Sequence, residues 1–345
     1  MEIERKTLKR ESLSQWLDQI AASGQRLLAP RTRDDRIRFE PVTSAKSVAT
    51  HYIQTTVSAK RALFPPVEEI LAFRFNDKDP QLDEKEMKAA PTVIFGIRPC
   101  DAHAFDTLHT VFSTDHRDDL FLNRWEQTTV IGVSCIRSDA YCFCTSVGGD
   151  PGSTRGSDVL LTPLPYREFL VEIITEKGKE LVESAAALFM PAEDFIDKQK
   201  VIAHVPQKFD AQALKSNLER LFGNDALWNR QALRCTGCGA CAYVCPTCQC
   251  FDIQDEQFGN QGKRLRCWDS CSFALFTLHT SGHNPRPSQA QRWRQRLMHK
   301  FSYQIDNLGV TGCVGCGRCS RACPTDMNIL EHVSEIVLEN VEEKP

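Results

Sequence analysis

The sequence predicts an α+β protein in which an N-terminal α/β domain is followed by a mainly helical domain. In the first part, short apolar runs of strand type alternate with segments of helical spacing, which is the pattern of βαβ units. In the second part, helical segments alternate with two cysteine-rich stretches. A turn-forming Gly-Asn-Asp sequence separates the two patterns. We therefore expect domains at 1–222 and 223–345.

The elements of the first domain follow from the spacing of its apolar residues. Leucine, tryptophan and isoleucine recur at three- and four-residue intervals near the N-terminus, which predicts a helix. Short runs rich in β-branched residues predict strands, and Asp101 is a good N-cap for a helix after the first of them. The expected helix spans 13–22, and the expected strands span 92–97, 128–133, 158–162 and 169–174.

The second domain contains the same cysteine pattern twice. In both copies the spacing is C-x2-C-x2-C-x3-C followed by proline. This is the bacterial ferredoxin pattern for 4Fe–4S clusters, in which the fourth cysteine of each run ligates the other cluster. The pattern therefore predicts two 4Fe–4S clusters. The expected ligand sets are Cys235, Cys238, Cys241 with Cys323, and Cys313, Cys316, Cys319 with Cys245.

Zinc sites and disulfide frameworks also use closely spaced cysteines. A zinc ribbon joins two C-x2-C pairs over a long spacer, whereas here each run packs four cysteines into eleven positions. Disulfides suit small secreted chains, and the N-terminal stretch shows no apolar signal segment. Iron–sulfur clusters are therefore the best match to both runs.

The two runs are far apart, because 78 positions separate Cys235 from Cys313. A compact bacterial ferredoxin places its runs closer, so either a long insertion or a helical two-cluster fold is required. We favour a helical dicluster ferredoxin-type domain, because apolar spacing predicts helices around the runs. These helices are expected at 210–222, 289–303 and 329–341.

Four more cysteines lie in the first domain. Two directly follow neighbouring strands, and two lie in the loop after the second strand. Loops at the same ends of parallel strands converge where open α/β sheets hold their ligands. Four thiolates there would suffice for a third metal centre, with a 4Fe–4S cluster favoured over zinc; the alternative is that they pack as small hydrophobic residues. They are Cys100, Cys135, Cys142 and Cys144.

The other four cysteines lie between the ferredoxin runs. We interpret them as neighbours of the clusters that tune the reduction potential through weak S–H hydrogen bonds or packing. A further cluster is the alternative. They are Cys248, Cys250, Cys267 and Cys271.

A basic stretch around Trp293 has three interpretations. Its cations raise the potential of a nearby cluster, dock an acidic partner, or form a solvated helix face. The basic residues are Arg292, Arg294, Arg296, His299 and Lys300.

Composition limits the location and the partners of the chain. With 345 residues and a net charge of −3, the chain has no general attraction to nucleic acid or anionic membranes. No run of 18 apolar residues occurs, so no membrane span is expected. Sixteen cysteines favour the reducing cytoplasm, where thiols stay available as metal ligands. We therefore expect a cytoplasmic protein.

Motifs for other chemistry are missing from the sequence. No G-x-G-x-x-G follows a strand and no P-loop occurs, and the glycines between Ser146 and Gly152 lack dinucleotide-binding spacing. No nucleophilic catalytic set can be placed, so we assign no catalytic residues. The clusters carry the expected chemistry.

Eight short segments make the chain more specific than a generic ferredoxin. They are Leu63-Phe-Pro-Pro66, Gly96-Ile-Arg-Pro-Cys-Asp101, Cys142-Phe-Cys144, Cys245-Pro-Thr-Cys-Gln-Cys-Phe-Asp252, Trp268-Asp-Ser-Cys271, Gly282-His-Asn284, His299-Lys-Phe301 and Cys313-Val-Gly-Cys-Gly-Arg-Cys319. With them the chain resembles, from about residue 60 to 330, a family of iron–sulfur electron-transfer subunits. The family is represented by the iron–sulfur subunit of anaerobic sulfite reductase and by the β subunit of cytosolic NiFe sulfhydrogenases.

The resemblance implies a non-catalytic electron-transfer subunit. Its partners would be a flavin subunit that takes hydride from NAD(P)H and a terminal catalytic subunit, either a NiFe hydrogenase or a sirohaem sulfite reductase. Clusters accept one electron at a time, so such a chain divides the two electrons of a hydride. Two alternatives stay open: a redox enzyme subunit whose α/β domain binds its own flavin or substrate, and an iron–sulfur redox sensor.

Overall fold

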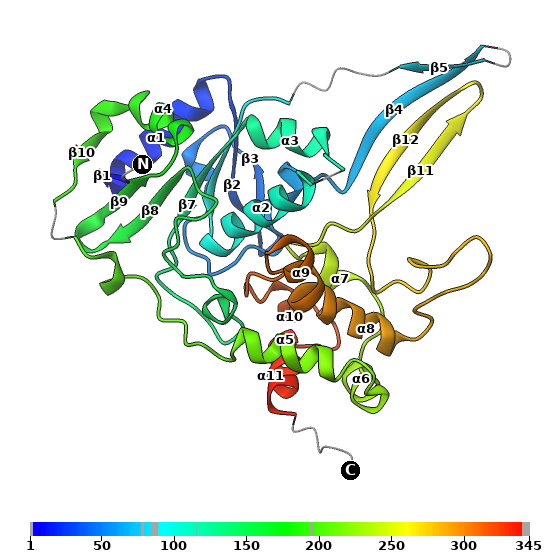
Figure 1. Cartoon of the computed structure of the whole chain (residues 1–345). Coiled ribbons are helices and arrows are strands. Elements are labelled where there is room, and N and C mark those ends of the chain that lie inside the picture. Colours follow the sequence, from blue (N-terminus) through cyan, green and yellow to red (C-terminus); the bar gives the residue numbers. More distant parts are fainter. Residues whose placement is uncertain (1–2, 77–78, 84–88, 115, 194–195, 340–345) are drawn as a thin grey trace.

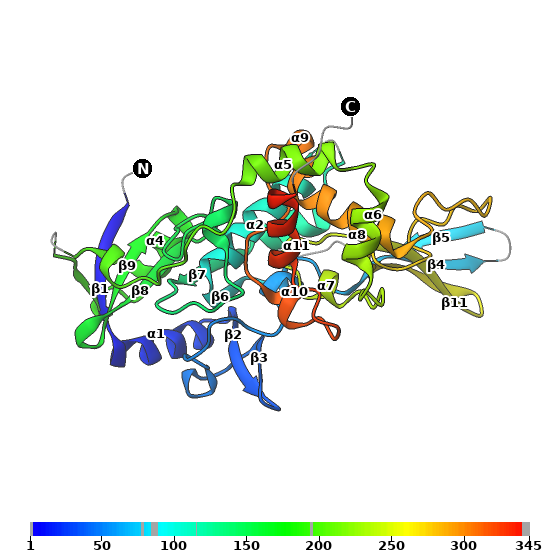
Figure 2. The same ribbon diagram turned by 90° about the horizontal axis from the view of Figure 1, so that it is seen from below.

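The structure is a computed structural model that describes residues 3–76, 79–83, 89–114, 116–193 and 196–339. It has a large sheet with helices on both faces, a helical part that contains both ferredoxin runs, and a long β-arm (Figure 1). Seen from the second direction, the helical part lies between the large sheet and the arm (Figure 2).

The large sheet has eight strands in the order β10-β1-β9-β8-β7-β6-β2-β3. The four central strands run parallel to one another; they are β2, β6, β7 and β8. The strands outside them pair antiparallel, with β3 on one side and β9, β1 and β10 on the other. The strands are β1 (Glu4–Lys9), β2 (Arg26–Arg33), β3 (Arg36–Pro41), β6 (Thr92–Ile97), β7 (Thr128–Val133), β8 (Val159–Leu164), β9 (Glu168–Ile173) and β10 (Phe189–Pro191).

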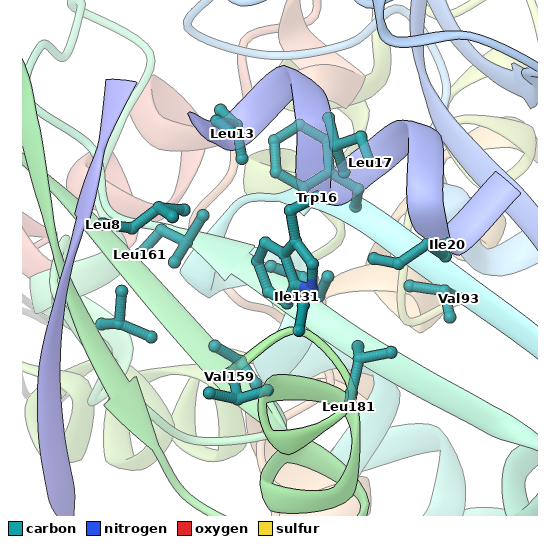
Figure 3. Packing of buried hydrophobic residues seen from close by; sticks show 14 of the residues in the cluster. Leu8, Leu13, Trp16, Leu17, Ile20, Val93, Ile131, Val159, Leu161 and Leu181 are labelled. Carbon is teal, nitrogen blue, oxygen red and sulfur yellow. The ribbon is translucent and has the colours of Figure 1, made fainter. Parts of the chain in front are cut away.

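Both faces of the central strands are buried, which explains why β6 is apolar throughout. On one face, helix α1 (Arg10–Ala22) inserts the fully buried Trp16 against Ile131, and helix α4 (Glu176–Glu183) covers the same face (Figure 3). On the other face, helices α2 (Pro99–Phe112) and α3 (Asp119–Glu126) pack on Ile94 and Val130. The sheet-rich first part expected from the sequence is confirmed.

The start of α2 differs from the expectation. Arg98 is the N-cap residue and Pro99 occupies the first turn, so the expected N-cap at Asp101 is wrong. Proline is favoured there because the first turn needs no backbone N–H donor. Asp101 lies inside the helix, where its carboxylate binds the Arg318 guanidinium of the C-terminal part.

The arm is a four-stranded antiparallel sheet in the order β11-β12-β4-β5. Its strands come from both sides of the expected domain boundary, and β12 pairs directly with β4. Because the arm joins strands from both sides of this boundary, the division into domains at 1–222 and 223–345 remains a prediction. The insertion between the ferredoxin runs contains this β-hairpin as well as helices. The strands are β4 (Val67–Asn76), β5 (Asp79–Asp83), β11 (Phe251–Phe258) and β12 (Gln261–Trp268).

The C-terminal part packs its helices around Trp228, Trp293 and Phe301. Phe143 of the first part joins this core, so the two parts pack together. The expected helix at 329–341 ends at Leu338, and its last two positions lie outside the described residues. The helical elements are α5 (Ala211–Arg220), α6 (Asp225–Ala232), α7 (Ala240–Tyr243), α8 (Gln289–Met298), the π-helical turn η7 (His299–Tyr303), α9 (Gln304–Leu308), α10 (Arg318–Arg321) and α11 (Ile329–Leu338).

No helix within the described ranges has the length and apolar character needed to cross a lipid bilayer.

Candidate metal centres

The two ferredoxin runs share one backbone conformation. Gly237 and Gly239 have φ of 69° and 74°, and the matching Gly315 and Gly317 have φ of 63° and 68°. This left-handed region is easily reached only by glycine. Each run then continues into a one-turn helix, α7 or α10. The repeated sequence is therefore a repeated structure.

The neighbourhood of Gly239 and Gly315 also excludes a side chain. A Cβ on Gly239 would stand 2.5 Å from the Phe273 ring, and one on Gly315 would stand 2.5 Å from the backbone nitrogen of Cys144. The first run is therefore packed against the loop after β12, and the second against the cysteine loop of the α/β part.

One pocket brings together the cysteines expected to hold the first cluster. Cys235, Cys238 and Cys241 line it with Cys323 of the distant second run. Gln289 donates a hydrogen bond from Nε2 to the Cys235 sulfur at 3.1 Å, and the Gly237 backbone N–H donates to the same sulfur. Hydrogen bonds of this kind stabilise an anionic thiolate.

The cysteines expected for the second cluster are near one another in the interior. Cys245, Cys313 and Cys316 are buried, and Cys319 interacts electrostatically with Cys245 and Cys313. Burial raises the pKa of Cys313 and of Cys316 to about 12, so both thiols are neutral without metal. Metal binding at these sites therefore requires the release of protons.

The cysteines of the first part converge at a second pocket, as the strand pattern predicts. Cys100 lies in the first turn of α2 after β6, and Cys135 follows β7 by two residues. Gln54 donates a hydrogen bond from Nε2 to the Cys100 sulfur at 2.9 Å. Burial raises the pKa of Cys135 to about 11 and that of Cys144 to about 12. The pocket is lined by Cys100, Cys135, Cys142, Cys144 and Cys316 of the second run.

Another pocket contains three of the four cysteines between the runs. Cys248, Cys250 and Cys271 line it together with His299. The fourth cysteine, Cys267, lies apart on strand β12 opposite Asp252.

Buried cations stand among these cysteines. Arg296 is 2% exposed and Lys300 is 4% exposed, so the solvated-face interpretation of the basic stretch is wrong for both. Burial alone lowers the pKa of Lys300, but the Cys245 and Cys248 thiolates raise it well above its ordinary value. Lys60, invisible as a site residue in the sequence, is 1% exposed beside Cys248.

The buried cations fit anionic clusters. Among the described residues, no carboxylate lies within ion-pair distance of Arg296, Lys300 or Lys60. A buried charge without a counter-charge is costly, and thiolate-ligated clusters supply the missing negative charge. Within the same part of the chain, no group of three or more Cys, His, Asp or Glu side chains has the arrangement for a single metal ion. Cysteines from separate segments line each of the pockets, which is the arrangement that a polynuclear cluster needs.

Comparison with known proteins decides the family. Residues 234–327 match the 4Fe–4S dicluster domain family. The chain is 30% identical to sulfhydrogenase 2 subunit beta of Pyrococcus furiosus over 325 residues, 92% of each chain. The chain belongs to this family of iron–sulfur electron-transfer subunits.

A second relative of the family shares a smaller part. The F420-dependent formate dehydrogenase subunit beta of Methanocaldococcus jannaschii is 26% identical over 162 residues, 46% of this chain and 35% of that one. No solved structure matches the chain significantly. The expected family and the two 4Fe–4S clusters are therefore confirmed, while the sulfite reductase branch of the resemblance finds no counterpart in these relatives.

Proposed function

We propose that this chain relays single electrons between a flavin subunit that oxidises NAD(P)H and a terminal catalytic subunit. The observation that carries the proposal is that the three expected ligand sets adjoin one another. Cys316 belongs to the expected second ligand set and also lines the pocket of the α/β part, while Cys319 of the same set lines the first pocket. A continuous row of redox sites is what a relay requires.

The proposed ligands follow the expected sets. Each ferredoxin run supplies three cysteines to one 4Fe–4S cluster and its last cysteine to the other. A third cluster occupies the pocket of the α/β part. Bound clusters of this kind accept and release one electron at a time. The sets are Cys235, Cys238, Cys241 and Cys323; Cys313, Cys316, Cys319 and Cys245; and Cys100, Cys135, Cys142 and Cys144.

The protein side chains hold the sites and adjust their charge. Gln289 and Gln54 donate hydrogen bonds to Cys235 and Cys100. Arg296 lies between the two ferredoxin runs, and its pKa is raised above the ordinary value because nearby thiolates, Cys241 first among them, outweigh burial. A cation in this position favours an added electron.

The partners are proposed from the family resemblance of the sequence and from the names of the relatives. The terminal subunit is a NiFe hydrogenase or a sirohaem sulfite reductase, and the hydrogenase is favoured because the full-length relative is a sulfhydrogenase subunit. We place the complex in the cytoplasm, since cysteines that serve as metal ligands need a reducing compartment and the chain has sixteen cysteines.

The test is anaerobic purification of the chain, followed by iron and acid-labile sulfide analysis and by reduction with an NAD(P)H-linked flavoprotein. We expect about 12 iron atoms per chain from these three sites, bleaching of the visible absorption, and no bound flavin. Cys238→Ala should remove about four iron atoms. A chain that holds zinc or flavin in place of iron, or that is not reduced, would contradict the proposal.

A further inference from the structure

We propose that Cys248, Cys250 and Cys271, together with His299, hold an additional iron–sulfur cluster beside the dicluster centre. The inference rests on the proposed function and extends the relay by one site. It also changes the interpretation of three cysteines that the sequence suggested were only neighbours of the clusters.

The arm places these cysteines together. The hairpin β11–β12 pairs Phe251 with Trp268 at its base, and the Asp269 backbone N–H donates to the Cys250 carbonyl at 3.0 Å. Cys250 and Cys271 are therefore brought face to face, and their side chains form a hydrogen bond. A third sulfur, that of Cys248, lines the same pocket and is coupled by a hydrogen bond to Cys245 of the first run.

His299 completes a set of four donors from separate segments. It begins the π-helical turn that follows α8 and lines the pocket with the three cysteines. A neutral imidazole offers a ring nitrogen lone pair to a metal. Imidazole replaces thiolate in some iron–sulfur sites.

Charge is the second observation that points to a cluster. Lys60 enters from the first part of the chain, donates from Nζ to the Cys248 carbonyl at 2.8 Å and lies 3.9 Å from the Trp268 ring centre. Arg296 donates to the Cys248 sulfur at 3.7 Å. Among the described residues no carboxylate pairs with either side chain, and thiolates bound to a cluster would supply negative charge beside both.

An unpartnered amide is the third observation. Gln304 lines the pocket and is 3% exposed, and its Nε2 has no hydrogen-bond partner among the described residues. In the two other pockets the corresponding donors, Gln289 and Gln54, each bind a cysteine sulfur. A buried donor without an acceptor is costly, and sulfur atoms of a cluster are acceptors of the same kind.

The experiment compares Cys271→Ser with Cys267→Ser in the full-length, anaerobically isolated chain. Cys267 is the matched control because it lies on β12, outside the pocket. We expect Cys271→Ser to lose about four iron and four sulfide atoms and one component of the electron paramagnetic resonance spectrum of the reduced protein. Cys267→Ser should match the parent protein.

Unchanged iron in Cys271→Ser, or loss of one zinc, would overturn the inference while leaving the other clusters in place. A parent chain without any iron would instead defeat the proposed function itself. A second variant, His299→Cys, separates ligation from folding. It should keep the iron content and lower the midpoint potential of the paramagnetic component that Cys271→Ser loses, because thiolate ligands give lower potentials than imidazole. An unchanged potential would exclude His299 as the ligand.

Discussion

Arg296 is the residue whose role is most open to direct measurement. Its guanidinium is buried and bonds to the Cys241 carbonyl at 3.1 Å, close to both ferredoxin runs. We expect Arg296→Gln to lower the midpoint potential of the dicluster centre by roughly 50 mV, about 1 kcal/mol for one electron. Arg294→Gln is the control, because Arg294 packs on Phe222 away from the cysteines. Equal potentials in protein-film voltammetry of both variants would contradict this role.

The buried His103 should make the free energy of unfolding depend on pH. It is 5% exposed on α2, and burial lowers its pKa to about 4 from the ordinary 6.5. Protonation therefore favours the unfolded chain, so the free energy of unfolding falls as the pH drops from about 6.5 toward 4. The loss is at most on the order of 3 kcal/mol.

Urea titrations at several pH values check this expectation. His103→Asn should flatten the pH dependence, while His109→Asn on the same helix should preserve it. A pH dependence in His103→Asn as steep as in the parent protein would show that other groups are responsible.

At the scale of elements, the one-turn helix α7 depends on glycine. Gly239 has a φ of 74°, and a Cβ there would stand 2.5 Å from the Phe273 ring. Gly239→Ala should cost about 1–2 kcal/mol for the backbone and more for the ring, and should lower the iron content. Gly223→Ala is the control, because nothing lies within 4 Å of its added methyl group. Thermal unfolding and iron analysis of both variants measure the difference, and equal values would refute it.

Comparison of elements shows what the sequence could predict. Strand β6 was predictable because all six of its residues are buried and apolar. Strand β11 was not, because all eight of its residues are exposed and its apolar alternation stops after Ile253. Its partner β12 is held by β4, which lies almost 200 positions earlier in the chain. Pairing over such a distance leaves no local signal.

The same contrast applies to the metal centres. The two runs were predictable because their cysteines are near in sequence, and the convergence of Cys100 with Cys135 followed from parallel strands. The pocket around Cys271 was not predictable, because the unrecognised hairpin brings it to Cys250. The burial of Lys60 beside Cys248, and the missing partner of the Gln304 amide among the described residues, are visible only in three dimensions.

At the scale of the whole molecule, a buried ion pair joins the two parts of the chain. Arg318 and Asp101 are both at most 2% exposed and form two hydrogen bonds. Arg318→Gln should reduce the free energy of unfolding by about 3–5 kcal/mol, because it leaves a buried carboxylate unpaired. Adding Asp101→Asn should recover part of the loss.

The exposed pair of Arg264 and Asp255 in the arm is the control for this cycle. Its removal should cost far less, because water screens an exposed ion pair. Chemical denaturation of the two single variants and the double variant measures the coupling, and strictly additive losses would mean that the pair does not join the two parts.

The central claim is that the chain stores and passes several electrons on iron held by its cysteines. Stepwise anaerobic reduction of the purified chain, with electrons and iron counted in the same sample, tests it most directly. The account predicts uptake of one electron for about every four iron atoms, with at least two electrons for the dicluster domain. A colourless chain that contains zinc and takes up no electrons would contradict it.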